Sequence, residues 1–188
     1  MQNSKSHHIG IIAAIIVVAA LSRLLFVLIP NFSPIGAIAL FGAAYFSRKW
    51  LAFAIPLAAM WMSDLLINNM LYPRLFPDYY DGNFAWGVSW WVYGAFAVVV
   101  LIGFALLKHV KVKNIVLASV LTAIVFFLVT NFGVWAGGTM YPKTAAGLGA
   151  CYVAAIPFFW NTLLSNLLFS GVLFGAYSYY QQQKLALA

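Results

Sequence analysis

The chain has 188 residues, of which 65% are hydrophobic and 7% are charged, and its mean hydropathy is +0.96. An ordinary soluble domain is about 45–50% apolar and about 25% charged. A water-soluble fold has nowhere to bury this much apolar surface, which excludes a soluble enzyme, an extracellular domain and a disordered chain. We therefore expect an all-α polytopic membrane protein that forms one integral membrane domain over residues 1–188.

Six predicted spans follow from the distribution of apolar residues, since a helix needs about 20 of them to cross a bilayer. In chain order they cover residues 9–29, 33–47, 50–70, 88–107, 114–134 and 151–177. The second is short because Pro30 and Pro34 interrupt the helical ladder before it. It crosses only if part of segment 30–34 also lies at membrane depth, where protein or a water-lined cavity must cover non-helical backbone. The sixth contains Pro157, so we expect a kink or an interfacial first turn there.

The few charges predict an orientation. With six spans both termini lie on one side, and seven basic residues fall on that side while two fall opposite, together with Asp78 and Asp81. The seven are Lys5, Arg48, Lys49, Lys108, Lys111, Lys113 and Lys184, and the two are Arg74 and Lys143. Cytoplasmic loops carry an excess of Lys and Arg. Both termini are therefore expected in the cytoplasm, and the stretches 71–87 and 135–150 on the outer side.

Two charges are predicted inside the membrane. Arg23 and Asp64 each lie about six residues before the outer end of their span, at similar depth, where a lone charge costs several kcal/mol. Their role is either structural, as an Arg23–Asp64 pair or with Arg23 snorkelling to the surface, or functional, with one or both contacting a polar group of a substrate. Asn68, one turn beyond Asp64, enlarges the polar patch.

Aromatic and amide side chains gather near the predicted outer ends of the spans. Trp90 belongs either to an aromatic belt at the headgroup level or to an outward cavity, since small-molecule sites are apolar with a few convergent polar groups. Tyr141 lies in the second outer stretch. Asn131, Asn161, Ser165 and Asn166 either converge on the same cavity or hydrogen-bond between helices.

Catalytic and cofactor motifs are sparse. The single cysteine, Cys151, is either a small buried hydrophobe or a thiolate ligand to a soft metal carried by the substrate. The sequence contains no His/Glu metal motif, nucleotide loop or Ser/His/Asp arrangement. We therefore expect no enzyme, no cofactor, no resident metal and no nucleic-acid partner, although an intramembrane enzyme acting through Asp64 or Cys151 is a third possibility.

Several segments together carry a family resemblance. They are residues 30–46 (PNFSPIGAIALFGAAYF), 55–57 (IPL), 63–66 (SDLL), 130–135 (TNFGVW), 141–142 (YP) and 157–161 (PFFWN). The chain resembles a family of uncharacterised bacterial six-helix membrane proteins. More distantly, through its size, topology and Ser-Asp pattern, it resembles the S components of energy-coupling-factor (ECF) vitamin transporters.

The resemblance implies a substrate-binding subunit of the bacterial inner membrane, with a pocket that opens to the outer side. S components capture a vitamin or similar micronutrient and dock on a shared transmembrane subunit driven by two ATPases. Many carry an Ala-x-x-x-Ala docking motif in the first helix, which residues 9–29 lack, while Ala39 and Ala43 have this spacing in the second predicted span. One type uses a cysteine to ligate cobalt, and Cys151 has a suitable outer position.

The leading hypothesis is therefore a membrane-embedded binding subunit for uptake of a vitamin-like small molecule. Its expected pocket residues are Asp64, Asn68, Trp90, Asn131, Tyr141 and Asn161, with Arg23 positioning Asp64. The alternative is a non-catalytic integral subunit of a larger membrane complex. In that case the contact surfaces are the outer loops and the helix faces with small residues four positions apart, which are Ala39/Ala43, Ala54/Ala58, Gly133/Gly137 and Gly171/Gly175.

Overall fold

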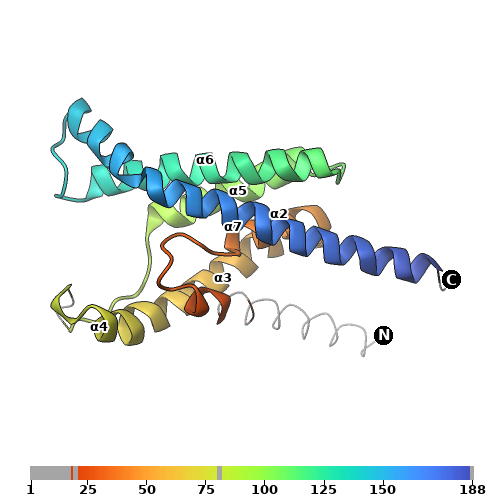
Figure 1. Ribbon diagram of the computed structural model, residues 1–188, viewed down its shortest axis with the longest axis horizontal. Coiled ribbons are helices and arrows are strands. Elements are labelled where there is room, and N and C mark those ends of the chain that lie inside the picture. The colour runs from red at the N-terminus through yellow and green to blue at the C-terminus, as the bar shows by residue number, and fades with distance from the viewer. Residues whose placement is uncertain (1–17, 19–20, 80–81, 187–188) are drawn as a thin grey trace.

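A computed structural model of the protein describes residues 18, 21–79 and 82–186, the side chains of 184–186 excepted (Figure 1). All regular elements in this part of the chain are helices, and it contains no strand. The expectation of an all-α protein is confirmed.

The helices follow one another along the whole described chain. They are α2 (Ile35–Tyr45), α3 (Leu51–Leu66), the π-helical turn η1 (Ile67–Leu71), α4 (Tyr72–Leu75), the 3-10 turn η2 (Pro77–Tyr79), α5 (Trp90–Leu106), α6 (Val112–Gly137) and α7 (Ala145–Ala186). Much of the first predicted span, 9–29, lies outside the described residues. Its described end is helical over residues 21–25 and then turns, so this helix ends four residues earlier than predicted.

Three helical stretches are long and apolar enough to cross a membrane, which indicates a membrane protein. They are Leu51–Leu75, which includes η1 and α4, Val112–Gly137 and Ala145–Gln183. α5 has 17 residues and α2 has 11, so α2 is only about 16 Å long at 1.5 Å per residue. A hydrocarbon core is about 30 Å thick. The structure therefore supports three of the six predicted crossings by length and composition.

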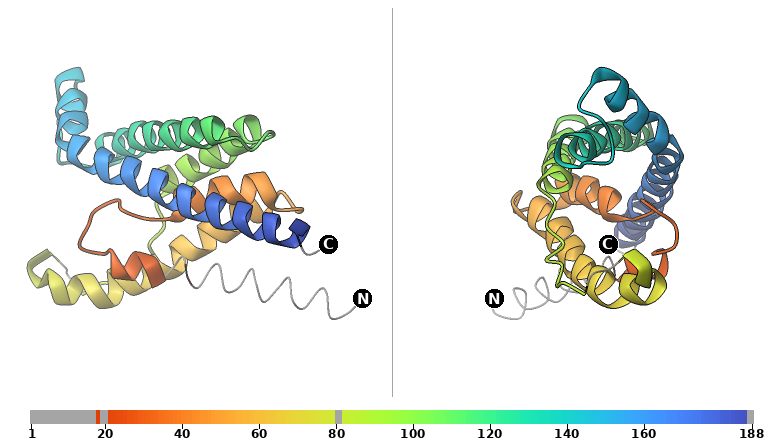
Figure 2. Two further views of the ribbon diagram at one scale, coloured as in Figure 1. Left: turned by 45° about the vertical axis from the view of Figure 1, so that its right-hand side comes forward. Right: turned by 90° about the vertical axis from the view of Figure 1, so that its left-hand side faces the viewer.

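The short helix α2 lies at the centre of the molecule. It contacts α3, α5, α6 and α7, and the end-on view in Figure 2 (right) shows it enclosed by these elements. Eight of its 11 residues are buried, including Ile35 and Leu40. A helix that is apolar all round lies in the interior of a protein or in a membrane, and here protein covers most of it. Its uniform hydrophobicity therefore reflects burial in protein, and the helix requires no contact with lipid.

The connections gather at two ends of the bundle. Figure 1 places the α2–α3 connection, the α5–α6 connection and the C-terminus at one end, and α4 and the α6–α7 connection at the other. The first end thus carries Arg48, Lys49, Lys108 and Lys111, whereas the second carries Arg74, Asp78 and Lys143. The predicted topology likewise places the first four residues on one side of the membrane and the other three on the opposite side.

The last helix is longer than predicted and bent. α7 has 42 residues, about 63 Å of helix, against the predicted span 151–177. Figure 2 (left) shows its first turns at a steep angle to the remainder. Pro157 lies within the helix, where it removes a backbone hydrogen bond and bends the ladder. The expected kink is thus present.

Small residues allow two close contacts between helices. A Cβ built on Gly103 of α5 lies 2.6 Å from Cβ of Ala43 on α2, and one built on Gly133 of α6 lies 2.2 Å from Cγ of Trp91 on α5. Distances this short mean that only glycine fits at either position. By contrast, a Cβ on Gly137 meets nothing within 4 Å.

We predict that Gly133→Ala destabilises the protein, because the new methyl group must displace the Trp91 indole; overpacking of this kind costs about 1–3 kcal/mol. The midpoint of thermal unfolding in detergent and the Trp fluorescence spectrum measure the effect. Gly137→Ala, four residues later on the same helix, is the matched control and leaves both unchanged or slightly raises the midpoint. Equal effects of the two substitutions would contradict the packing described.

Candidate functional site

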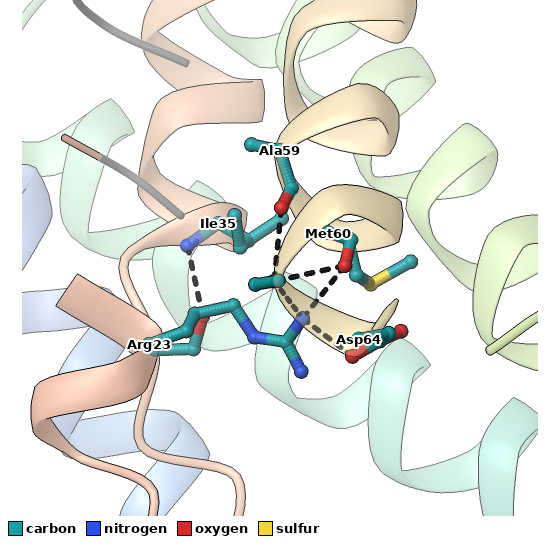
Figure 3. Close-up of polar contacts among 7 residues, drawn as sticks. Arg23, Ile35, Ala59, Met60 and Asp64 are labelled. Atoms are coloured by element: carbon teal, nitrogen blue, oxygen red, sulfur yellow. Dashed lines mark hydrogen bonds and ion pairs between the residues drawn. The ribbon is translucent and has the colours of Figure 1, made fainter. Parts of the chain in front are cut away.

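An ion pair joins residues 21–25 to α3. Nη1 of Arg23 lies 2.7 Å from Oδ1 of Asp64, and the two side chains are only 21% and 18% exposed. The same nitrogen donates to the backbone carbonyl of Met60 at 3.1 Å and to Oγ of Ser63 at 2.5 Å. Figure 3 shows the guanidinium reaching across to the side of α3 that presents these groups. The two intramembrane charges predicted from the sequence are therefore paired directly.

Ser63 completes this network from inside α3. Its side chain is fully buried, and its hydroxyl lies 2.9 Å from the carbonyl oxygen of Ala59 and 2.8 Å from that of Met60. A hydroxyl that donates to a preceding carbonyl leaves its lone pairs free to accept. Ser63 can therefore accept from Arg23 while it donates to its own helix, which holds the guanidinium in one orientation.

A cavity of about 330 Å³ lies beside this pair. Its walls come from the segment before α2, from α2 itself and from α3, η1, α4, α5, α6 and α7. Its lining residues are Arg23, Phe26, Val27, Ile29, Pro30, Asn31, Phe32, Ser33, Ile35, Gly36, Met60, Asp64, Ile67, Tyr72, Val92, Phe96, Thr122, Phe126, Thr162, Ser165 and Asn166. Ile29, Pro30 and Asn31 are exposed, so the cavity reaches the surface at this loop.

The 30–34 segment is the non-helical backbone expected before α2. Asn31 adopts a left-handed conformation with φ 60°, which turns the chain between the two prolines. Nδ2 of Asn161 on α7 donates to the carbonyl of Pro30 at 2.9 Å. The segment thus lines the cavity and is fixed to α7.

Hydroxyl and amide groups form a second polar region of the cavity. Thr122 is 1% exposed, and its Oγ1 has no hydrogen-bond partner among the described residues. Beside it, a Cβ built on Gly36 lies 2.4 Å from Oδ1 of Asn166 and 3.3 Å from Cγ2 of Thr122. Nδ2 of Asn166 donates a long hydrogen bond, 3.5 Å, to the carbonyl of Ser119. α2 thus approaches α6 and α7 closely at position 36, where any side chain would have to displace the Asn166 amide.

Aromatic rings form much of the remaining wall. Phe26 and Phe32 pack edge to face at 5.1 Å between centroids, and both contact Phe169 of α7. Phe96 of α5 and Phe126 of α6 pack at 5.3 Å. The cavity is therefore bounded by flat apolar surfaces, with the ion pair and the Thr122 region as its polar parts.

The loop before α5 passes directly over Asp64. Gly87 has φ +68°, and a Cβ built on it lies 2.7 Å from Cβ of Asp64. Asn69 in η1 fixes this loop, since its Nδ2 donates to the carbonyl of Ala85 and its Oδ1 accepts from the Ala85 amide, both at 2.8 Å. π-helical turns occur frequently at functional sites. Here the turn directs an asparagine at the loop that covers the ion pair.

The structure brings two of the seven expected pocket residues, Arg23 and Asp64, to the cavity wall. Asn68 lies beside the loop over Asp64 and lines a separate hollow with Asn69 and Phe84. Trp90 begins α5 and is 83% exposed.

The other three expected residues lie elsewhere. Asn131 donates to the carbonyl of Phe127 one turn earlier on α6, and Tyr141 lies in the α6–α7 connection. Asn161 reaches the cavity only through its hydrogen bond to Pro30. Ser165 and Asn166, also considered for this region, do line the cavity.

Cys151 is buried against α6, and its Sγ lies 3.4 Å from the carbonyl oxygen of Asn131. It is outside the cavity lining. Among the described residues no group of three or more His, Cys, Asp or Glu side chains comes together to hold a metal ion.

Thr122 and the phenylalanines of the wall were not singled out from the sequence. A threonine in an apolar helix resembles many that bond back to their own carbonyls, as Thr130 does to Phe126 and Thr162 does to Phe158. Only the rotation of α6 shows that the Thr122 hydroxyl has no such partner.

Comparison with known proteins adds a family. The model of a family of unknown function, DUF6580, matches residues 3–187. The chain belongs to this family. No curated protein and no solved structure matches it. The family membership covers almost the entire chain, and these findings add no link to ECF S components.

We predict strong coupling between Arg23 and Asp64. Arg23→Met or Asp64→Leu alone leaves the partner as an uncompensated, largely buried charge and lowers the free energy of unfolding by about 3 kcal/mol. The double variant removes both charges and recovers most of this loss. Unfolding midpoints in detergent for the four proteins measure the coupling. Additive losses in the double variant would show that the ion pair contributes nothing of its own.

We also predict that Gly87→Ala loosens the loop over Asp64. The substitution adds a Cβ that clashes with Asp64 and also strains a backbone with positive φ. Gly82→Ala is a matched control, because Gly82 has φ +80° but nothing within 4 Å of a built Cβ. The control should cost about 1 kcal/mol and Gly87→Ala about 1–3 kcal/mol more. Faster amide hydrogen exchange in residues 82–89 of the Gly87 variant alone is the expected signature.

Proposed function

We propose that the protein is a membrane-embedded binding subunit that takes up a vitamin-like small molecule from the outer side of the bacterial inner membrane. The observation that carries the proposal is the cavity of about 330 Å³ with the Arg23–Asp64 pair in its wall. Intramembrane ionisable residues are rare and costly, and they commonly mark substrate pathways.

The size and lining of the cavity favour a small organic ligand. Ligand sites have volumes of about 300–1,000 Å³, with mostly apolar and aromatic walls and a few placed polar groups. This cavity lies at the small end of that range. It therefore fits a compact micronutrient better than a large metal-containing one, and the position of Cys151 outside the lining agrees with this choice.

The direction of uptake is proposed from charge. The end of the bundle with the α2–α3 and α5–α6 connections has the basic residues Arg48, Lys49, Lys108 and Lys111, and cytoplasmic loops carry such an excess. The opposite end, which has Asp78, then faces outward. Tyr72, at the start of α4 at this end, lines the cavity, so we assign the cavity opening to the outer side.

A partner that supplies energy belongs to the same proposal, through the resemblance to S components. Gly171 and Gly175 lie on the exposed face of α7, and a Cβ built on either meets no described atom within 4 Å. Small residues at this spacing let another helix approach closely. This face is a suitable docking surface for a transmembrane subunit coupled to ATPases.

The same glycine face also favours the second candidate function, a non-catalytic subunit of a larger membrane complex. The two functions differ in what the cavity does. Crosslinking in native membranes with a stoichiometric partner that is not an ATP-driven module, together with a cavity that binds no small molecule, would support the second.

We predict that Val92→Phe abolishes ligand binding without unfolding the protein, because Val92 lines the cavity and the larger ring occupies space that is otherwise available. Mass spectrometry of small molecules that co-purify with the detergent-solubilised protein provides the measurement. Val98→Phe, on the same helix at an exposed position, is the control and retains the ligand. Equal small-molecule content in both variants, or none in the unaltered protein, would overturn the proposed function.

A further inference from the structure

We propose that the ligand of this cavity is a compact molecule without net charge. A hydrogen-bond acceptor on it meets Arg23, a flat apolar body lies between the phenylalanine rings, and a second polar group meets Thr122. This inference rests on the proposed function and specifies its substrate class. Its strongest support is Thr122, a fully buried polar side chain in the cavity wall whose hydroxyl has no partner among the described residues.

The absence of net charge on the ligand follows from the wall. Arg23 and Asp64 are the only charged side chains among the described lining residues, and they neutralise each other at 2.7 Å. A charged ligand would enter a largely apolar space with no opposite charge left to meet it. Burial of an unpaired charge is far more costly than burial of a hydrogen-bonded polar group. The wall therefore selects against both anions and cations.

Arg23 specifies an acceptor at one end of the ligand. A guanidinium has five N–H donors and no acceptor. Among the described residues, the hydrogen bonds that Arg23 donates to Asp64, Ser63 and Met60 all come from Nη1. A carbonyl oxygen of an amide or a ring lactam can accept from the remaining donors, and it requires no charge to do so.

Thr122 specifies a second polar group. An unsatisfied buried hydroxyl costs about 1–3 kcal/mol. Oγ1 of Thr122 has almost no exposed area in the free protein, so a ligand that turns this hydroxyl toward the cavity and bonds to it recovers the cost on binding. The amide of Asn166 lies beside it, because both approach Gly36. A hydroxyl both donates and accepts, so a ring nitrogen, an amide or a hydroxyl on the ligand would each serve.

The flat body follows from the rings of the wall. Phe26 and Phe32 come from the segment before α2, and Phe96 and Phe126 come from α5 and α6. Aromatic rings pack favourably in offset or edge-to-face arrangements. A planar heteroaromatic ring therefore gains more from these walls than a flexible chain of equal size, and its ring atoms provide the second polar group.

The test uses matched compounds that share a ring and differ chiefly in charge. For pyridine, quinoline and isoquinoline, the panel holds the 3-carboxamide, the 3-carboxylate and the N-methylated carboxamide cation. Calorimetry near neutral pH with the full-length protein in detergent measures each affinity. We expect carboxamides to bind at least about tenfold more tightly than either charged form, a difference that corresponds to 1.4 kcal/mol.

Thr122→Val tests the polar end. Removal of the unpartnered hydroxyl should raise the unfolding midpoint of the free protein and weaken carboxamide binding about three- to tenfold, the worth of one neutral hydrogen bond. Thr130→Val on the same helix is the control, since that hydroxyl donates to the Phe126 carbonyl at 2.7 Å. It lies outside the lining and should leave affinity unchanged. A purely structural Thr122 would show no loss of affinity.

Several results would overturn the inference. They are tighter binding of a charged form than of its carboxamide, unchanged carboxamide affinity in Thr122→Val, and failure of every carboxamide to bind. The proposed function survives any of these if the unaltered protein still carries a small molecule that Val92→Phe loses. It fails separately if no small molecule is carried.

Discussion

The burial of α2 is the constraint on which the other features depend. This helix of 11 residues contacts α3, α5, α6 and α7, and it is too short to cross a hydrocarbon core of about 30 Å. The chain that precedes it is non-helical over residues 30–34, and Nδ2 of Asn161 on α7 donates to the Pro30 carbonyl there. The cavity forms at this place because a segment without regular structure leaves a space that neighbouring helices cannot fill.

Two polar regions line the cavity, the Arg23–Asp64 pair and Thr122, and they differ in how many hydrogen bonds they make within the protein. Arg23, Ser63 and Asp64 bond to one another and to the backbone of α3, so this region is organised by the protein itself. The Thr122 hydroxyl has no hydrogen-bond partner in the part of the chain that the structure describes. A cavity with one preformed and one unsatisfied polar region gains most from a ligand that completes the second without disturbing the first.

The pairing of Arg23 with Asp64 could be anticipated because charged residues are so rare in this chain that each one is informative. Asn131 and Asn161 were identified in the sequence in the same way, as amides in apolar helices. In the structure, Asn131 donates to a carbonyl of its own helix and Asn161 donates to the Pro30 carbonyl of the loop before α2. An amide in an apolar helix can bond to its own backbone, to a neighbouring helix or to a ligand. The rotation of the helix selects among these, and in α6 and α7 nearly uniform apolarity on every face leaves that rotation undefined by pattern.

The sequence by itself indicated that the protein belongs in a membrane and is helical. It also predicted the break before α2, the bend in α7 and the two charges, Arg23 and Asp64, that need partners. These follow from composition and from local chemistry, since prolines interrupt helices and charges avoid hydrocarbon wherever they stand. Tertiary structure alone decided that α2 is central, that Gly87 covers Asp64 and that Thr122 faces a cavity. Each of these depends on which helix faces meet. When helices are apolar all round, the shapes of their surfaces decide which faces pack together. Those shapes arise from the combined positions of glycines, alanines and aromatic rings, so no single residue in the sequence predicts the packing.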